Sequence, residues 1–312
     1  MSPPTIAIAG FTGKMARLIT ASLLSTHPHA LIHGIARSPE KVPAAIKTHK
    51  NVTTFAASAT DPAALRTALR GASVCICCYL GDAALMLDGQ KQLIDACIAE
   101  RVPRYIASDW SLDFRPLALG EHPAKDPMKH VQAYLEEKER EGKIKGVHVL
   151  NGAFMEVVWA RFTGFVDVER DAFFAWGTGD EKIEVAAMGD VAAWTAGVAV
   201  DGGASGFLNF LGDRKSVKEL AKLYEDVYGV TPTIENKGTL EELEVAKKAA
   251  FEADPGNYNV WRGLFYQLVM LSGKTNLGPL DNKRYPMVEP KNVEAFLKEH
   301  TKESVGKSIF FF

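Results

Sequence analysis

Hydrophobic and polar positions in the first half of the chain alternate between short apolar runs and longer stretches with helical spacing. Apolar runs of strand length lie at Thr5–Ala9, Leu31–Ala36, Val52–Ala56, Val74–Cys78, Arg104–Ser108 and Val147–Leu150. Helical patterns fill the gaps at Lys14–Leu24, Asp61–Leu69, Ala83–Glu100 and Met128–Glu141. This alternation predicts an α/β fold with a doubly wound parallel sheet, whose ligands bind beyond the carboxyl ends of the strands.

The alternation loosens after Asn151. Helices are predicted over Glu156–Phe165, Val191–Val200, Val217–Tyr228, Leu240–Ala253, Tyr258–Leu271 and Asn292–His300, and strands over Phe173–Trp176, Ile183–Ala187 and Phe207–Phe210. We therefore expect two domains. Residues 1–155 form the first, and residues 156–312 form a smaller α+β lobe for the substrate, with segments free to interleave with the first.

Composition and charge narrow the classes of partner. Hydrophobic residues make up 47% and charged residues 24% of the 312 residues, as in ordinary globular proteins. The formal charge is −2, with no long run of either sign, so we expect neither nucleic acid nor an anionic membrane as a partner. Neither a secretion signal nor a membrane span is visible, which predicts a cytoplasmic protein. The sequence leaves open whether the chain forms a homodimer.

The cysteines and histidines do not form a metal or redox motif. Three of the four cysteines lie in the predicted strand Val74–Cys78. Alternation along a strand sends Cys75 and Cys78 to opposite faces, so their CxxC spacing does not bring two thiols together. The histidines are scattered, and we predict no metal site.

A glycine-containing turn joins the first predicted strand to the first predicted helix. Gly10, Gly13 and Ala16 form a G-x-x-G-x-x-A array there. Gly10 permits a tight turn, Gly13 lets the backbone approach a pyrophosphate, and Ala16 allows close packing of helix on strand. The alternative is a simple turn, but the strand before and the helix after favour a Rossmann-type dinucleotide site. Its expected residues are Gly10, Phe11, Thr12, Gly13, Lys14 and Met15.

Arg37 indicates which dinucleotide binds. It follows the second predicted strand, 24 residues after Gly13 (37 minus 13). An acidic residue here would bind the ribose 2′-hydroxyl of NAD, whereas a guanidinium grips the 2′-phosphate of NADP. Lys14 and Lys41 are possible helpers. A solvated surface arginine is the alternative, and the absence of a nearby carboxylate favours NADP(H).

Four groups of residues together resemble the NmrA-like and isoflavone reductase-like proteins, which are atypical short-chain dehydrogenase/reductases. They are Gly10-Phe11-Thr12-Gly13, Arg37, Ala107-Ser108-Asp109-Trp110 and Asn151-Gly152-Ala153-Phe154. The likeness lies in their order and spacing over the first half of the chain. It implies a cofactor lying over the first six strands, with Tyr79, Leu80 and Asn151–Phe154 at its nicotinamide end.

The resemblance also implies a catalytic site near the predicted Met128–Glu141 helix. Reductases of this family usually keep a lysine at the start of the helix, but here Met128 falls on that position and Lys129 is its neighbour. One residue of offset rotates a helical side chain by about 100°, so Lys129 reaches the nicotinamide only if the helix begins differently. Lys125 in the preceding loop is another candidate. The alternative for both lysines is a solvated position on the surface, where lysines are usually found.

Two further side chains are candidates for catalysis. Tyr134 and Lys138 form a YxxxK pair, in which a nearby cation lowers the pKa of the phenol and lets it donate a proton to a carbonyl. Tyr134 is also in register with Val131 and Leu135, which favours core packing. Ser108, at the end of the fifth predicted strand, is placed to hydrogen-bond a substrate oxygen or to cap the strand.

These observations lead to three functional hypotheses. The first is an NADPH-dependent reductase of a small, apolar or aromatic carbonyl or enone, with a proton from Lys129, Tyr134 or water and with Phe154 lining an aromatic-accepting pocket. The second is a regulator that binds NADP(H) without turnover, which Met128 at the usual acid position favours. The third is a non-redox isomerase or cyclase on the same scaffold.

Overall fold

The computed structural model describes residues 3–307 and divides into two compact units. Unit 1 contains the chain up to Trp110, Ala118–Leu150 and Val191–Leu208. Unit 2 contains Ser111–Leu117, Asn151–Asp190 and the chain from Asn209.

Unit 1 is built on a seven-stranded sheet with the strand order β11-β6-β5-β4-β1-β2-β3. The strands are β1 (Thr5–Ala9), β2 (Leu31–Ala36), β3 (Val52–Ala56), β4 (Val74–Cys77), β5 (Arg104–Ile106), β6 (Lys145–Leu150) and β11 (Gly206–Asn209). Neighbours from β1 to β6 pair in parallel. The strand order reverses beside β1, between β2 and β4, which makes the carboxyl end of β1 the topological switch point. The predicted doubly wound α/β fold is confirmed.

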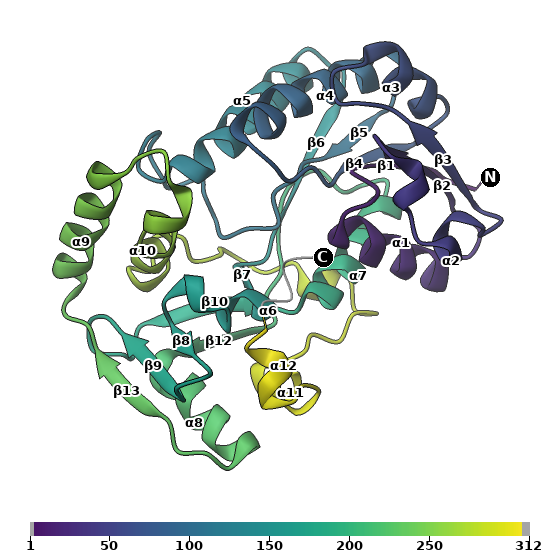
Figure 1. The fold of residues 1–312 in the computed structure, drawn as a ribbon. Coiled ribbons are helices and arrows are strands. Elements are labelled where there is room, and N and C mark those ends of the chain that lie inside the picture. Colours follow the sequence, from purple (N-terminus) through teal and green to yellow (C-terminus); the bar gives the residue numbers. More distant parts are fainter. Residues whose placement is uncertain (1–2, 308–312) are drawn as a thin grey trace. The chain divides into compact units, whose positions relative to one another are not determined.

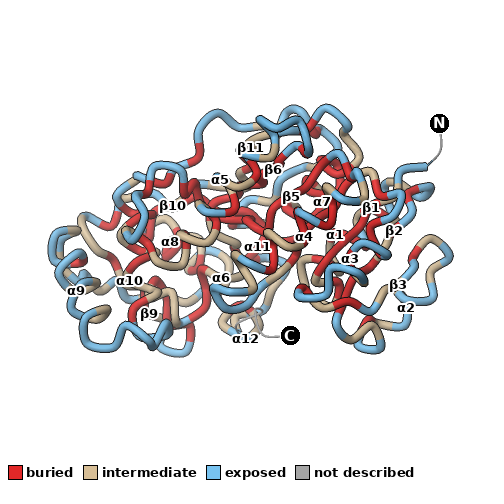
Figure 2. Tube along the Cα trace, turned by 90° about the horizontal axis from the view of Figure 1, so that it is seen from above, coloured by how far each residue is buried: buried red, intermediate tan, exposed pale blue. Residues whose placement is uncertain are grey.

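Helices cover both faces of this sheet (Figure 1). They are α1 (Lys14–Thr26), α2 (Ala44–Lys47), α3 (Pro62–Leu69), α4 (Gln90–Ala99), α5 (Asp126–Arg140) and α7 (Met188–Val200), with the short turns η1 (Pro39–Lys41), η2 (Leu85–Gly89) and η3 (Pro123–Lys125). Helices α3, α4 and α5 share one face. There Leu69, Leu93 and Val131 pack on Cys75 and Tyr105 of the sheet, all fully buried. The central strands β1, β4, β5 and β6 are therefore the most buried part of the unit (Figure 2).

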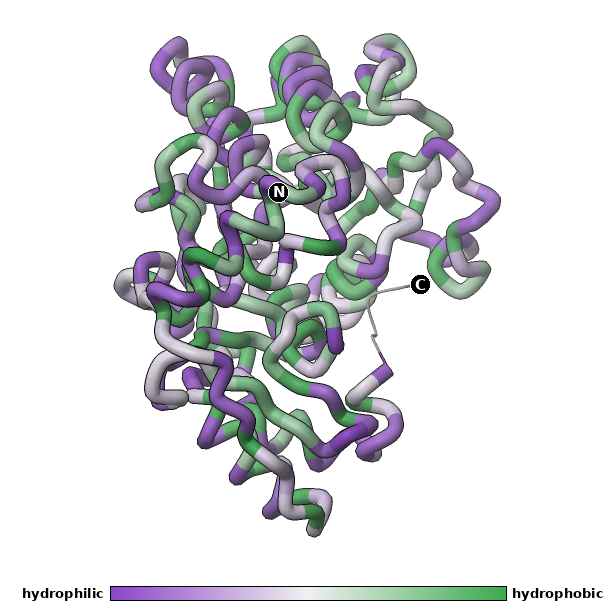
Figure 3. Tube along the Cα trace, turned by 60° about the vertical axis from the view of Figure 1, so that its left-hand side comes forward, coloured by the Kyte–Doolittle hydropathy of each residue, from purple (hydrophilic) through white to green (hydrophobic). Residues whose placement is uncertain are grey.

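The helices of unit 1 form where the sequence places apolar side chains at helical spacing. In α1 the buried positions are Ala16, Ile19, Thr20 and Leu23, which lie on one face of the helix. Hydrophilic and hydrophobic residues are accordingly interspersed along the helical turns (Figure 3). The side chain of Asp61 accepts a hydrogen bond from the backbone N–H of Ala64 at 3.0 Å, and this contact fixes the start of α3.

Two predicted helices of unit 1 begin differently in the structure. The first part of the predicted Ala83–Glu100 helix is a π-helical turn, η2, and the side chain of Gln90 donates to the carbonyl of Met86 at 2.8 Å beside it. Helix α5 begins at Asp126 rather than at Met128. Pro127 does not prevent this earlier start, because a proline in the first helical turn loses no intrahelical hydrogen bond.

The cysteines are core residues of unit 1. All four are free and buried. Cys75, Cys77 and Cys97 share one face of the sheet with α3, α4 and α5. Burial raises the pKa of the Cys75 and Cys78 thiols well above the ordinary value, which disfavours the reactive thiolate. Within residues 3–307 there is no cluster of three or more His, Cys, Asp or Glu side chains placed to hold a metal ion.

Unit 2 contains two three-stranded sheets with the orders β12-β10-β7 and β13-β9-β8. The strands are β7 (Ala153–Phe154), β8 (Val166–Asp167), β9 (Ala172–Ala175), β10 (Lys182–Ala186), β12 (Asp213–Ser216) and β13 (Thr233–Asn236). The helices are α6 (Met155–Val158), α8 (Val217–Tyr228), α9 (Leu240–Ala253), α10 (Tyr258–Leu271), α11 (Val293–Lys298) and α12 (Lys302–Val305), with the turns η4 (Arg161–Thr163) and η5 (Asn282–Arg284). The described helices include none long and apolar enough to cross a membrane.

The predicted helix over Glu156–Phe165 is wrong, because α6 ends at Val158 and only the turn η4 follows. The hydroxyl of Thr163 donates to the carbonyl oxygens of Val158 and Ala160 at 3.0 and 2.8 Å. These bonds compete with a continuous helical ladder. Gly164 then reverses the chain in the left-handed region, at φ 74°.

Candidate functional site

The turn after β1 requires glycine at its first position. Gly10 has φ 76°, and a Cβ there would lie 2.5 Å from the carbonyl oxygen of Cys78. The backbone N–H of Gly13 donates to the carbonyl of Gly10 at 2.9 Å, which closes the turn. The chain therefore passes directly over the end of β4, and four residues, Gly10–Gly13, separate β1 from α1.

Helix α1 opens at this turn without a side-chain cap. Its N-cap is Gly13, and the first helical hydrogen bond runs from the N–H of Arg17 to the carbonyl of Gly13 at 3.1 Å. The amides of the first helical turn lack intrahelical acceptors, and the helix dipole places positive potential there. This opening fits a phosphate or diphosphate group.

Phe11 anchors the turn to the neighbouring strand. Its backbone N–H donates to the carbonyl of Ile35 in β2 at 3.0 Å. Its ring is 1% exposed and lies so close to Gly34 that a Cβ on this glycine would come within 2.3 Å of it. Phe11 is predicted as a cofactor residue, and the structure places its ring in the core, where it positions the turn. The other predicted side chains of the turn are half-buried: Thr12, Lys14 and Met15.

Arg37 is the first residue after β2 and is exposed. Because β1 and β2 are parallel neighbours, with Ala9 beside Ile35, their carboxyl ends share one edge of the sheet. Arg37 forms no ion pair with any of residues 3–307. Its guanidinium is therefore available to an anionic group at the edge where α1 opens.

Ser108 ties the loops after β4 and β5 together. Its hydroxyl donates to the carbonyl of Tyr79 at 2.7 Å, and its backbone N–H donates to the side chain of Gln90 at 3.1 Å. The residue is 4% exposed. Leu80, next to Tyr79, is 80% exposed. The structure thus brings Ser108, Tyr79 and Leu80 to the carboxyl edge, and burial raises the pKa of the Tyr79 phenol.

The start of α5 carries the candidate lysines. Lys125 is the N-cap residue and is 4% exposed, Met128 is buried, and Lys129 is half-buried. At 15 residues α5 is about 22 Å long, and it leads into the amino end of β6. Its start therefore lies on the side of the sheet where the strands have their carboxyl ends, the side of the glycine turn.

The pKa of Tyr134 is raised, not lowered as the YxxxK pattern predicts. The phenol donates to Asp95 of α4 at 2.5 Å, and burial together with this carboxylate raises its pKa to about 12. Lys138 is paired with Glu137 at 2.7 Å, and its own effect on the phenol is outweighed. Tyr134 lies eight residues into α5, about 12 Å along the helix from its start.

A buried acid–histidine pair at the same edge has no signal in the sequence. The Nδ1 of His148 in β6 donates to the Oδ2 of Asp109, which follows Ser108, at 2.6 Å, and the two side chains are 4% and 1% exposed. The Oδ1 of Asp109 is buried without a hydrogen-bond partner among the described residues. The next residue, Trp110, has φ 37°, a conformation rare for a bulky residue. Strain and an unsatisfied carboxylate oxygen often coincide at functional sites.

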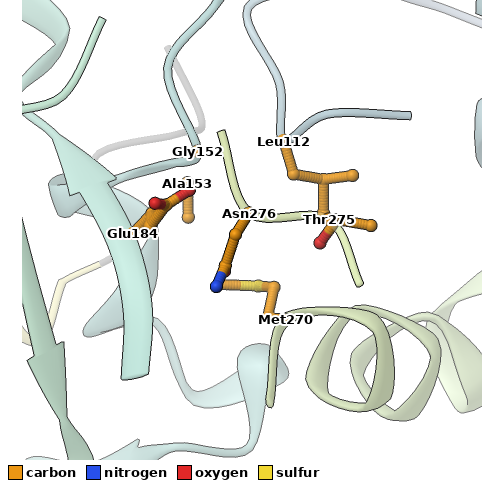
Figure 4. Close-up of a pocket in the computed structure, with 7 residues that line it drawn as sticks. All are labelled: Leu112, Gly152, Ala153, Glu184, Met270, Thr275 and Asn276. Atoms are coloured by element: carbon orange, nitrogen blue, oxygen red, sulfur yellow. The ribbon is translucent and has the colours of Figure 1, made fainter. Parts of the chain in front are cut away.

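Asn151 and Phe154 belong to unit 2. The backbone N–H of Asn151 donates to the carbonyl of Ser111 at 2.9 Å, and its side-chain Oδ1 is buried with no hydrogen-bond partner in residues 3–307. Gly152 has φ 68°, and a Cβ on it would lie 2.4 Å from the carbonyl of Glu184. Figure 4 shows the small cavity beside this contact, with Glu184 from β10 and Asn276 from the loop after α10 among its lining residues.

Unit 1 thus has the parts of a dinucleotide-binding protein at one edge of its sheet. A glycine turn, an uncapped helix N-terminus and an arginine after the neighbouring strand meet at the topological switch point. A family model described as NAD(P)H-binding matches residues 10–199, which is more than half of the chain. The chain belongs to this NAD(P)H-binding family.

A known relative agrees with this assignment. An NmrA-like family domain-containing oxidoreductase of Gibberella moniliformis is 27% identical over 173 residues, which are 53% of this chain and 54% of the relative. The chain thus matches about half the length of that relative.

Solved structures share the fold. An isoflavone reductase has a TM-score of 0.77 at 17% identity, with 95% of this chain and 99% of that chain covered. An NADPH-dependent quinone oxidoreductase of Escherichia coli, in complex with NADPH, has a TM-score of 0.70 at 21% identity, with 94% and 99% covered. The predicted resemblance to NmrA-like and isoflavone reductase-like proteins is confirmed, as is a nicotinamide dinucleotide as cofactor.

Proposed function

We propose that the protein is an NADPH-dependent reductase of a small, apolar or aromatic carbonyl or enone. The observation that carries this proposal is the placement of a dinucleotide turn and a buried lysine, Lys125, on the carboxyl side of one sheet. A cofactor turn alone supports binding. An ionisable side chain held out of water on the same side of the sheet supports chemistry.

The residues of unit 1 fit NADPH. The first-turn amides of α1 bind the diphosphate, and Gly10 keeps the turn low enough over Cys78 for this approach. Arg37, exposed and without an ion-pair partner among the described residues, binds the 2′-phosphate. This contact is the reason for preferring NADPH to NADH. When bound, the cofactor supplies a hydride to the substrate.

The proton comes from Lys125 in this proposal. Of the other candidates, Ser108 is a hydroxyl that donates to the backbone carbonyl of Tyr79, and Tyr134 lies about two turns into α5 with its pKa raised by burial and by Asp95. Lys125 is more buried than Lys129 and stands at the start of α5. An ammonium group at that position is suited to protonate the substrate atom that becomes negative during reduction.

The substrate class is inferred from the structural neighbours. One is an isoflavone reductase and another a quinone oxidoreductase, and isoflavones and quinones are both conjugated carbonyl compounds. We infer an aromatic or quinonoid enone of one to three rings as the substrate of this chain, consistent with the hypothesis that the sequence supports. Small-molecule turnover also fits the absence of any long run of like charge.

The test is a turnover assay with the full chain. NADPH is mixed with a panel of aryl ketones, chalcones, isoflavones and quinones, and the loss of nicotinamide absorbance is followed, with NADH in parallel. We expect sustained oxidation of NADPH with at least one member and slower oxidation of NADH. Tight binding of NADPH without oxidation across the panel would contradict the reductase.

One observation favours a second function, a sensor that binds NADP(H) without turnover. Met128 is 8% exposed at the position where the family usually has its lysine. A thioether cannot supply a proton. The same panel separates the two functions, because a sensor leaves NADPH unoxidised while calorimetry shows different affinities for NADPH and NADP⁺.

A further inference from the structure

Unit 2 contains a pocket of about 330 Å³ formed wholly by its own residues. It lies among α10, η4, β9 and the residue after β13, and it shares no lining residue with the small cavity of Figure 4. Aromatic side chains from Phe162, Phe174 and Trp176 line it, together with Arg170 and Lys237. This volume lies at the lower end of the range for ligand sites, roughly 300–1,000 Å³.

The walls of this pocket are fixed by a buried amide. Gln267 of α10 is 3% exposed, its Oε1 accepts a hydrogen bond from Trp176 Nε1 at 3.1 Å, and its Nε2 donates to the carbonyl of Thr163 at 2.7 Å. These bonds join α10, η4 and the residue that follows β9. Gly263 adds a close approach, because a Cβ there would lie 2.5 Å from the carbonyl of Phe162. The pocket is therefore preorganised.

The rim of the pocket carries a net positive charge. Glu235 lies between the two cations, 3.1 Å from Arg170 and 3.4 Å from Lys237. The three charges sum to +1 (two cations minus one carboxylate). The Nζ of Lys237 also lies 4.5 Å from the centroid of the Phe174 ring, so one cation is held at an aromatic wall.

We propose that this pocket binds a planar aromatic carboxylate of one or two rings. The ring would lie against Trp176 and Phe174, where apolar area is buried. The carboxylate would pair with Lys237 and Arg170 at the rim, which are partly neutralised by a single glutamate. An organic cation would meet two like charges, and a neutral ring would leave the excess charge unmatched. The proposal does not depend on the redox chemistry of unit 1.

The first experiment measures binding by calorimetry with the full chain saturated with NADPH, so that the dinucleotide site is occupied. The probes are 2-naphthoate and 2-naphthamide, which have the same ring system and differ in charge. We expect naphthoate to bind at least tenfold more tightly than naphthamide, and more weakly at high salt, because the cations at the rim are partly exposed. Equal affinities, or no binding of naphthoate to the NADPH-saturated chain, would overturn the proposal.

Variants locate the site. Lys237→Gln should weaken naphthoate at least tenfold, whereas Lys248→Gln, a change to an exposed lysine of α9 outside the pocket, should leave it unchanged. Val260→Trp, at a half-exposed lining residue, should block binding by filling the pocket, and Val245→Trp, at an exposed residue of α9 that does not line it, should not. Naphthoate affinity that is unaffected by both Lys237→Gln and Val260→Trp would refute the site.

Discussion

The turn after β1 and the start of α5 serve the same edge of the sheet by different physical means. At the turn, the geometry is set by backbone: Gly10 lies over the carbonyl of Cys78, and Gly13 donates back to Gly10. At the start of α5, the geometry is set by side chains such as Lys125 and Met128, one a cation and one apolar, both buried. Binding of the diphosphate thus depends on space at the turn, and chemistry depends on which side chain stands at the start of α5.

This difference predicts how substitutions behave. A site whose geometry is set by the backbone tolerates almost no added atom at the point of closest contact, whereas distant charges affect it little. A side-chain site tolerates changes of shape but loses its chemistry when one ionisable group is removed.

The first substitution is Gly10→Ala. It places a Cβ 2.5 Å from the carbonyl of Cys78 at φ 76°. We expect a loss of about 4 kcal/mol in the free energy of unfolding, from left-handed strain and overpacking together, and no measurable NADPH binding. Urea unfolding and calorimetry provide the measurements.

Gly71→Ala is the matched control for that change. Gly71 has φ 73°, but nothing lies within 4 Å of its Cβ position. It should cost only about 1 kcal/mol, the strain of the left-handed conformation alone. Equal losses in the two variants would show that glycine is required at position 10 because of the left-handed backbone conformation, and not because of the contact with the carbonyl of Cys78.

The second substitution, Lys125→Met, tests the side-chain site. We expect kcat to fall by about 100-fold or more, the usual effect of removing a general acid, with an unchanged dissociation constant for NADPH that shows intact folding. Lys129→Met should lower kcat less than threefold. A large loss with Lys129→Met and none with Lys125→Met would transfer the proton-donating role to Lys129.

The contrast between backbone and side-chain geometry also explains which features of the structure can be predicted from the sequence. The strands β1 to β6, the glycine turn and the position of Arg37 follow from local patterns, because each depends on neighbours in the chain. Helices α8, α9 and α10 have the predicted bounds for the same reason, with capping boxes at Ser216 and Thr239 marking the first two starts.

Contacts between residues far apart in the sequence cannot be predicted from local sequence patterns. Nothing in the sequence indicates that Tyr134 meets Asp95, 39 residues away, or that His148 meets Asp109. The segment Val191–Leu208 likewise gives no local sign that it belongs to unit 1, where Arg104 donates to the carbonyl oxygens of Val198 and Ala199 at the end of α7. The catalytic part of the site consists of such pairs, so it is the part that the sequence predicts least.

The third substitution, Arg37→Ala, tests the choice of cofactor. Removing a charge-assisted bond to the 2′-phosphate should weaken NADPH by about 10- to 100-fold, and NADH by less than twofold. Arg70→Ala, at an exposed arginine that faces Glu100 instead, should change neither affinity. Equal losses for NADPH and NADH in Arg37→Ala would refute the proposed contact with the 2′-phosphate.

The smallest effect is expected for Tyr134→Phe, which removes the hydrogen bond to Asp95. Turnover should not change, because this phenol lies two turns into α5 and holds its proton for Asp95. The free energy of unfolding should fall by about 1 kcal/mol near neutral pH, the usual net value of one hydrogen bond.

The pH dependence of that difference identifies its cause. The folded pKa is about 12, above the ordinary value of 10 in the unfolded chain. A raised pKa means that the folded state holds the proton more tightly, so the contribution to stability is complete below pH 10 and is lost as the pH rises towards 12. The difference between wild type and Tyr134→Phe should therefore be constant up to pH 10 and then shrink. If kcat instead fell 100-fold with unchanged NADPH binding, Tyr134 would be the acid and the side-chain site would lie along α5, not at its start.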